Sequence, residues 1–142
     1  MIERISPEEA KEKLESDEGY VYIDVRDVSE FEQGHPEGAV NIPVLERGLM
    51  GMTPNHHFVA VCEANYTKDQ KIITGCLRGG RSLRAAEMLI SAGFTAVIDM
   101  RGGFDGEMGP GGIGYEGWSR RGLPVSTEPK PGARYEELKN KA

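Results

Sequence analysis

The chain is poor in cysteine and has no long apolar run. Two cysteines in 142 residues allow at most one internal disulfide, which excludes a disulfide-rich secreted scaffold. No apolar stretch approaches the roughly 20 residues of a membrane-spanning helix, so no membrane partner is expected. The formal net charge of -6 disfavours a general nucleic-acid binder. By length, the chain predicts a single domain with one core.

The first six residues lack the basic start and the apolar stretch of a secretory signal. We therefore expect a cytoplasmic protein, or an organellar one if a targeting segment has been removed. No oligomeric state is predicted.

One short segment carries most of the chemistry in the sequence. Cys76 and Leu77 are followed by Arg78, Gly79, Gly80 and Arg81. The apolar run 71–75 before them is typical of a buried strand, and the spacing of apolar residues in 82–92 predicts a helix. The loop therefore joins a strand to a helix N-terminus, where backbone amides and the helix dipole favour an anion.

The two arginines of this loop add positive charge that favours a thiolate at Cys76, which makes Cys76 a candidate nucleophile. A free cysteine at a strand end is more often an ordinary buried residue. Here the glycines and arginines beside it are poor core material and good anion-site material, and they favour the chemical interpretation.

The spacing of the loop separates two chemistries. Phosphatases with a cysteine nucleophile place an arginine at the sixth position after the cysteine, and here that position is Ser82. Arg81 lies at the fifth position, which predicts a smaller cradle suited to one sulfur atom carried on Cys76. This spacing disfavours a phosphatase or an arsenate reductase.

The loop and its flanking segments resemble the single-domain rhodanese family of thiosulfate sulfurtransferases. The resemblance covers approximately residues 5–125 and rests on segments in the same order as in that family: 22–26, 31–43, 81–86, 93–94, 101–104, Trp118 and 122–125. The resemblance implies an α/β, rhodanese-like fold, with a small parallel β-sheet and helices on both faces. It also implies a rhodanese-like domain, which we place at 1–125. From Ser126 the chain is charged with little apolar content, so a charged C-terminal tail is expected at 126–142, either mobile or a surface helix.

The resemblance implies Cys76 as the catalytic residue. It implies that the substrate is bound by the loop residues Leu77, Arg78, Gly79, Gly80 and Arg81. The sulfur donor would be thiosulfate and the acceptor cyanide, a thiol or a thioredoxin-like protein, with no metal and no cofactor. The alternative is a non-catalytic rhodanese-like module that binds proteins or carries sulfur.

Secondary structure is predicted from capping residues and periodicity. Helices are expected to start at Ser6-Pro7 and Asp27 and to cover 44–50, 56–64 and 82–92, with strands at 20–25, 39–42, 71–75 and 95–99. The glycine-rich stretch 105–117 is expected to be a surface loop.

Other candidate motifs have simpler explanations. Residues 112–117 match a dinucleotide fingerprint by letter but follow no predicted strand, so they are interpreted as loop. The three histidines do not share a helix face, and Asp24, Asp27 and Glu30 are explained by capping and ion pairing. Cys62 is expected to be a plain buried residue of a helix, although a redox role is an alternative.

Overall fold

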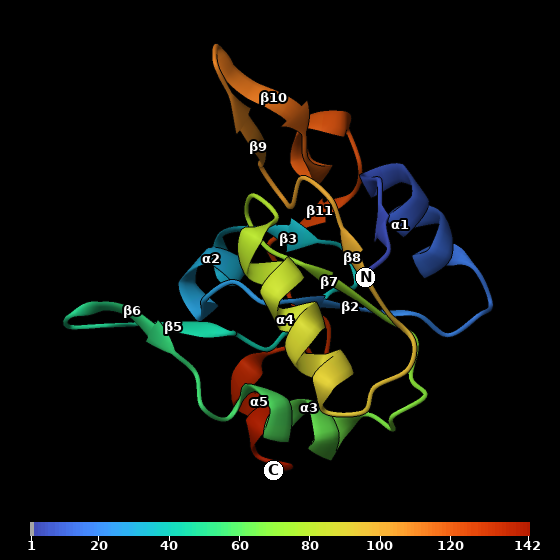
Figure 1. The fold of residues 1–142 in the computed structure, drawn as a ribbon, viewed down its shortest axis with the longest axis vertical. Coiled ribbons are helices and arrows are strands. Elements are labelled where there is room, and N and C mark those ends of the chain that lie inside the picture. The colour runs from blue at the N-terminus through green and yellow to red at the C-terminus, as the bar shows by residue number, and fades with distance from the viewer. Residues whose placement is uncertain (1) are drawn as a thin grey trace.

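The computed structural model describes residues 2–142, and a five-stranded parallel sheet runs through its centre (Figure 1). The strand order is β1-β8-β7-β2-β4. In chain order these strands are β1 (Arg4–Ile5), β2 (Val21–Asp24), β4 (Val40–Asn41), β7 (Ile72–Gly75) and β8 (Val97–Met100). The helices are α1 (Pro7–Glu15), α2 (Val28–Gln33), α3 (Phe58–Asn65), α4 (Gly80–Ser91) and α5 (Tyr135–Lys139). The predicted α/β architecture, a small parallel sheet covered by helices, is confirmed.

Two helix starts form by the predicted capping boxes. The Ser6 hydroxyl accepts the Glu9 amide at 3.1 Å, and the Glu9 carboxylate accepts the Ser6 amide at 3.0 Å. Asp27 and Glu30 make the same reciprocal pair at the start of α2. Each box satisfies two amides that have no partner inside the helix.

The central strand β7 is buried along its whole length between β2 and β8. Because all three strands are parallel, their carboxyl ends meet at one edge of the sheet. Arg26, Cys76 and Arg101 lie close after these ends. Helix α4, which follows β7, packs against β7 and β8 and crosses in front of the sheet in Figure 1.

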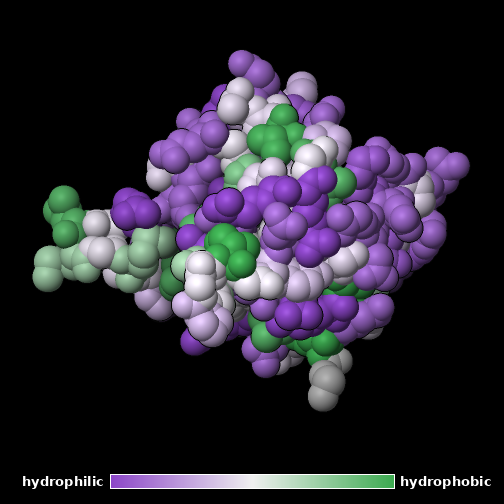
Figure 2. All heavy atoms as spheres, turned by 90° about the horizontal axis from the view of Figure 1, so that it is seen from above, coloured by the Kyte–Doolittle hydropathy of each residue, from purple (hydrophilic) through white to green (hydrophobic). Residues whose placement is uncertain are grey.

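The helix predicted for 44–50 is wrong, because this region forms an antiparallel hairpin of β5 (Leu45–Gly48) and β6 (Gly51–Pro54). Gly48 would weaken a helix interior by about 1 kcal/mol, and Gly51 takes a positive φ of 97° that suits a turn. The hairpin projects from the body with apolar side chains at its tip (Figure 2). Leu49 and Met50 are fully exposed there, so these apolar residues do not pack on the core as those of the predicted helix would.

The stretch 105–117 is also more regular than the predicted surface loop. It forms a second antiparallel hairpin, β9 (Gly106–Gly109) and β10 (Gly112–Glu116), with a register shift between Ile113 and Tyr115. The apparent fingerprint at 112–117 is therefore mostly strand rather than loop. The guanidinium groups of Arg101 and Arg121 lie over the Tyr115 ring, 4.0 and 4.7 Å from its centroid.

Four short elements were not predicted: the edge strand β1, the strand β3 (His35–Pro36), its antiparallel partner β11 (Val125–Ser126) and the 3-10 helix η1 (Trp118–Arg121). Trp118 is buried, with its ring centroid 6.3 Å from that of Tyr22, and its indole donates to the Pro124 carbonyl at 2.7 Å. These contacts hold the segment that follows the second hairpin against the core.

The last segment forms the short helix α5, and its apolar residues belong to the core. Ala133, Tyr135 and Leu138 are buried. The amide of Asn55 donates to the Tyr135 hydroxyl at 3.0 Å, and that of Asn65 to the Leu138 carbonyl at 2.9 Å. Of the two expected forms, the structure therefore has the helix and not the mobile tail. The division of the chain into a domain at 1–125 and a tail at 126–142 stays a prediction.

Across residues 2–142, every helix is too short or too polar to cross a lipid bilayer.

Candidate active site

Cys76 lies directly after β7, at the carboxyl edge of the parallel sheet. Its side chain is buried, and its Sγ accepts a hydrogen bond from the Gly79 amide at 3.0 Å. Gly79 has a φ of 104° and caps α4, which starts at Gly80, two residues before the predicted start. The sulfur therefore sits at a helix N-terminus, where the amide and the helix dipole stabilise negative charge.

Two backbone carbonyl groups of the loop that follows β7 are fixed by hydrogen bonds. The Cys76 carbonyl accepts the Phe104 amide at 2.7 Å, and the Leu77 carbonyl accepts the Asp105 amide at 2.9 Å. Within residues 2–142, the amides of Leu77 and Arg78 donate to no protein acceptor. Two amides of the predicted cradle thus remain available to an anionic ligand.

Two glycines make this close packing possible. A Cβ on Gly103 would lie 2.5 Å from the carbonyl carbon of Leu77, so any side chain there would push against the active-site loop. A Cβ on Gly75 would collide with the Tyr22 hydroxyl. Cys76 consequently lies next to two backbone positions, Gly75 and Gly103, that tolerate no side chain.

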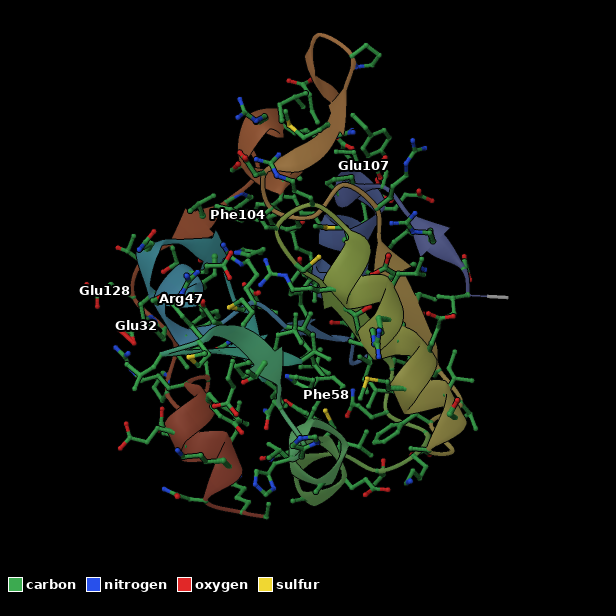
Figure 3. All side chains as sticks on the ribbon, turned by 60° about the vertical axis from the view of Figure 1, so that its left-hand side comes forward. Glu32, Arg47, Phe58, Phe104, Glu107 and Glu128 are labelled. Atoms are coloured by element: carbon green, nitrogen blue, oxygen red, sulfur yellow. The ribbon has the colours of Figure 1, made fainter. Side chains whose placement is uncertain are left out.

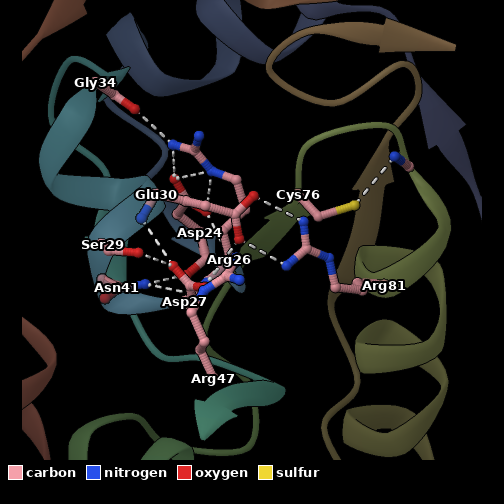
Figure 4. A network of polar contacts seen from close by, with 11 residues as sticks. Asp24, Arg26, Asp27, Ser29, Glu30, Gly34, Asn41, Arg47, Cys76 and Arg81 are labelled. Atoms are coloured by element: carbon pink, nitrogen blue, oxygen red, sulfur yellow. Dashed lines mark hydrogen bonds and ion pairs between the residues drawn. The ribbon is translucent and has the colours of Figure 1, made fainter. Parts of the chain in front are cut away.

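Arg81 forms a bidentate ion pair with Glu30 of α2 (Figure 4). Its Nη1 and Nη2 lie 2.9 and 3.1 Å from the two carboxylate oxygens. Partial burial raises the pKa of Glu30, but hydrogen bonds and charge from Arg81 outweigh it, and the pKa is lowered. The hydrogen bonds to Glu30 also raise the pKa of Arg81. The pair joins the active-site helix to α2.

Arg78 turns toward the second hairpin. It pairs with Asp105 at 3.1 Å and donates to the Gly106 carbonyl at 3.2 Å. The structure therefore brings Cys76, Leu77 and Gly79 together as predicted, whereas both arginines of the loop are engaged by carboxylates. An anion at the loop would share these guanidinium groups with Asp105 and Glu30.

Behind the loop, Arg26 makes a buried network with Asp24 (Figure 4). Its Nε and Nη2 donate to the carboxylate at 3.0 and 2.7 Å, and Nη2 also donates to the Gly34 carbonyl at 2.6 Å. Burial alone would lower the pKa of Arg26, but the Asp24 charge more than offsets it and the pKa is raised. The guanidinium also stacks 4.6 Å from the Phe104 ring centroid. The predicted ion-pair role of Asp24 is confirmed.

Sequence reasoning missed Asp99, a buried carboxylate under the loop on β8. It accepts from the Thr74 hydroxyl and from Arg4 Nε, both at 3.0 Å. Burial raises its pKa despite these hydrogen bonds. The signal was present, because Asp99 is the single charged residue in a short apolar strand.

Phe104 and Asp105 also line a cleft of about 320 Å³ beside the loop. Its other walls include Leu77, Glu30 and Arg26. Figure 3 shows Phe104 on the side of the second hairpin and Phe58 on the side of α3. This cleft gives solvent a route to the loop.

Cys62 lies in α3 and is fully buried. Burial raises the pKa of its thiol to about 12. Both cysteines are free, which agrees with the predicted plain buried role of Cys62. Among residues 2–142, no three His, Cys, Asp or Glu side chains are grouped as metal ligands would be.

Comparisons with known proteins indicate one family. A family model described as Rhodanese-like domain matches residues 6–106. Thiosulfate sulfurtransferase 16, chloroplastic, from Arabidopsis thaliana is 41% identical over 107 residues, covering 75% of this chain and 80% of that protein. The senescence-associated protein DIN1 of Raphanus sativus is 39% identical over 107 residues, 75% of this chain, and the chain spans only 52% of its length.

A solved structure shows the same fold. The crystal structure of Rv0390 from M. tuberculosis superposes with a TM-score of 0.74 at 29% identity, covering 88% of this chain and 97% of that one. The predicted rhodanese-like fold is thus confirmed. With a family model over most of its length and a sulfurtransferase relative of 41% identity, this chain belongs to the rhodanese-like domain family.

Proposed function

We propose that this chain is a thiosulfate sulfurtransferase that carries the transferred sulfur on Cys76. The observation that carries the proposal is the Gly79 amide 3.0 Å from Cys76 Sγ, at the N-terminus of α4. A sulfur held in this way is stabilised as an anion both before and after it gains a second sulfur. The name of the Arabidopsis relative, a thiosulfate sulfurtransferase, supports the same donor.

In the first half-reaction, the Cys76 thiolate attacks the outer sulfur of thiosulfate. A bond forms between the two sulfurs, the sulfur–sulfur bond of thiosulfate breaks, and sulfite leaves with the electron pair. The products are a Cys76 persulfide and sulfite. The amides of Leu77 and Arg78 and the guanidinium groups of Arg78 and Arg81 would bind the sulfonate oxygens.

In the second half-reaction, a thiophilic acceptor attacks the outer sulfur of the persulfide. With cyanide, the product is thiocyanate, and the electron pair of the broken bond returns to Cys76 as thiolate. The sulfur keeps its oxidation level throughout, so neither step requires a cofactor. Because the enzyme is modified between the two substrates, we expect ping-pong kinetics.

The test is thiocyanate formation from thiosulfate and cyanide. We expect activity in the native chain and a loss of at least about 1,000-fold in Cys76→Ser, because the serine hydroxyl cannot carry the sulfur. Cys62→Ala is the matched control and should stay within about twofold of native. Comparable activity in Cys76→Ser would refute the proposal.

One observation favours the second candidate, a rhodanese-like module that binds proteins or carries sulfur without turnover. Both loop arginines are already held by carboxylates, and Cys76 is only 2% exposed. Mass spectrometry after thiosulfate treatment separates the candidates. One added sulfur on Cys76 with no thiocyanate formed would favour the carrier, and an unchanged mass would favour the binding module.

The location of the protein belongs to the same proposal. The Arabidopsis relative is named chloroplastic, which favours the organellar alternative over the cytoplasmic one.

A further inference from the structure

Arg84 is the one arginine among residues 2–142 that makes no ion pair and no side-chain hydrogen bond. Every other arginine in this part of the chain has a partner: those at 4, 26, 47, 78, 81, 101, 120, 121 and 134. Arginine is a preferred side chain for binding carboxylates because its planar fork offers two parallel donors. In a chain with a net charge of -6, a guanidinium without a carboxylate partner is an exception that needs a reason.

Arg84 lines a cleft that extends to Arg81, in the first turn of α4. Arg81, Arg84 and Met88 lie on one face of α4 at helical spacing. This face forms one wall of a cleft of about 340 Å³, and the opposite walls come from the base of the first hairpin and the start of α3. The full lining is Val44, Leu45, Pro54, Asn55, His56, Val59, Arg81, Arg84 and Met88.

The cleft combines an apolar floor with positive charge. Val44 is buried, while Leu45, Val59 and Met88 are partly buried and pack against the core. No lining residue carries a negative charge, so the lining contains two arginines and no acid. Its volume lies near the lower end of the range of small-ligand sites, about 300–1,000 Å³.

Two other clefts contain more acidic than basic side chains. The larger cleft beside α2, of about 530 Å³, is lined by Asp27, Glu32 and Glu46 with Arg47 as its single cation. The cleft beside Leu77 contains Glu30 and Asp105 with Arg26 as its single cation. Of the Glu30–Arg81 ion pair, Glu30 lines the cleft beside Leu77 and Arg81 lines the cleft of about 340 Å³ that contains Arg84. Arg84 also lines a second cleft, of about 640 Å³, but that lining contains Glu87. The cleft of about 340 Å³, with two arginines and no acid, is therefore the better suited to an organic anion.

We propose that this cleft binds the organic part of the sulfur acceptor, a small thiol with an apolar chain and a carboxylate, and that Arg84 anchors the carboxylate. This inference rests on the proposed sulfurtransferase function. The apolar chain lies on Val59 and Met88, and Arg81 connects the cleft to the loop that holds Cys76. Arg84 is thus a specificity-determining residue for the acceptor, outside the anion cradle.

The transfer step is balanced without a further reactant. The acceptor thiolate attacks the outer sulfur of the Cys76 persulfide, and a new sulfur–sulfur bond forms on the acceptor. The bond to Cys76 Sγ breaks, and its electron pair stays on Cys76 as thiolate. The acceptor leaves as an organic persulfide.

The kinetic test compares two acceptors that differ only in charge, 6-mercaptohexanoate and 6-mercaptohexanol, with thiosulfate as donor. In the native chain we expect kcat/KM to favour the acid by about tenfold, as a charge-assisted contact provides. Arg84→Gln should bring the ratio close to one, Arg84→Lys should restore part of it, and the control Arg134→Gln should leave it unchanged. Cyanide turnover should be equal in all four proteins. A ratio near one in the native chain, or a ratio unchanged in Arg84→Gln, would overturn the inference.

A binding measurement separates this inference from the proposed function. Hexanoate has no thiol, so its binding to Cys76→Ser by isothermal titration calorimetry does not depend on sulfur transfer. Binding that is lost in the Cys76→Ser/Arg84→Gln double variant supports the cleft, even if no thiocyanate forms from cyanide. Equal binding in both variants, or none in Cys76→Ser, refutes it.

Discussion

Cys62 and Cys76 are exposed by 0% and 2%, so burial does not distinguish them. What surrounds the two sulfurs is different. Cys62 sits inside α3, where burial raises the pKa of its thiol to about 12. Cys76 sits at a strand end and receives the Gly79 amide at 3.0 Å, at the start of α4. The comparison teaches that a buried thiol becomes a candidate nucleophile through nearby backbone donors and positive charge rather than through exposure.

Selective alkylation tests this comparison most directly, and we expect its effect to be the largest. Iodoacetamide at pH 8 should modify Cys76 at least about 100-fold faster than Cys62, because a thiol with a pKa of about 12 is almost entirely protonated at that pH. Peptide mass spectrometry over time gives the two rates. In denaturant the rates should converge, and faster modification of Cys62 in the folded protein would contradict the comparison.

Gly103→Ala should damage the surroundings of Cys76 without touching its side chain. Gly103 has a φ of 63°, and an added Cβ would lie 2.5 Å from the Leu77 carbonyl carbon. We expect the free energy of unfolding to fall by about 3 kcal/mol or more, from backbone strain and overpacking together. Urea denaturation measures this change.

The matched control for that variant is Gly122→Ala. Gly122 has a similar φ of 73°, but an added Cβ would meet nothing within 4 Å. It should therefore cost only about 1–2 kcal/mol, the penalty of the left-handed conformation. Equal losses in the two variants would show that contact with the active-site loop is not what requires glycine at 103.

Glu30→Gln removes the carboxylate that pairs with Arg81, and so tests the surroundings of Cys76. The pKa of Glu30 is lowered below its ordinary value of 4.5 in the folded chain. Its contribution to stability is therefore present above pH 4.5 and is lost as the pH falls through the lower folded value. We expect the variant to be less stable by about 1 kcal/mol at pH 7, because the pair is only partly buried.

Urea denaturation at pH 7 and at pH 3 would measure this difference. The gap in the free energy of unfolding between native chain and variant should narrow at the lower pH, because a falling pH favours protonation of Glu30 in the native chain. Glutamine keeps a side-chain oxygen for the capping box, so helix α2 should start as before. A gap that is the same at both pH values would exclude the Arg81 pair as its cause.

Arg78→Ala should have the smallest effect. The guanidinium is partly exposed and shared with Asp105, so we expect KM for thiosulfate to rise only a few-fold. A neutral persulfide donor should be affected less, because it presents no sulfonate. Arg120 also pairs with Asp105, at 3.1 Å, which makes Arg120→Ala the matched control for steady-state kinetics. Equal effects on both donors would remove Arg78 from the anion site.

Local features of the site were predictable from the sequence. Cys76, its glycines and its position between a strand and a helix follow from residue spacing within a short window. The capping boxes at Ser6 and Asp27 depend on residues only three positions apart, and both form as predicted. Cys62 was placed correctly in a helix because its neighbours are apolar and contain no helix breaker.

Contacts between distant segments could not be predicted in the same way. Glu30 and Arg81 are separated by 51 positions, and no local pattern indicates that α2 and α4 bring them together. The pairing of Arg78 with Asp105 likewise depends on the path of the second hairpin. The wrong helix prediction at 44–50 has a related cause. Apolar residues form a buried helix face only where another element packs against them, and the local sequence does not show whether such an element is present. Leu49 and Met50 face solvent instead.

The first hairpin also offers a practical handle on the protein. Its turn projects well clear of the body in Figure 1, while the sheet and α4 that hold Cys76 lie elsewhere in the chain. A peptide tag inserted between Leu49 and Met50 would extend an already solvent-exposed turn. Such an insertion would allow the protein to be immobilised on a support through this one loop, with both termini left unmodified.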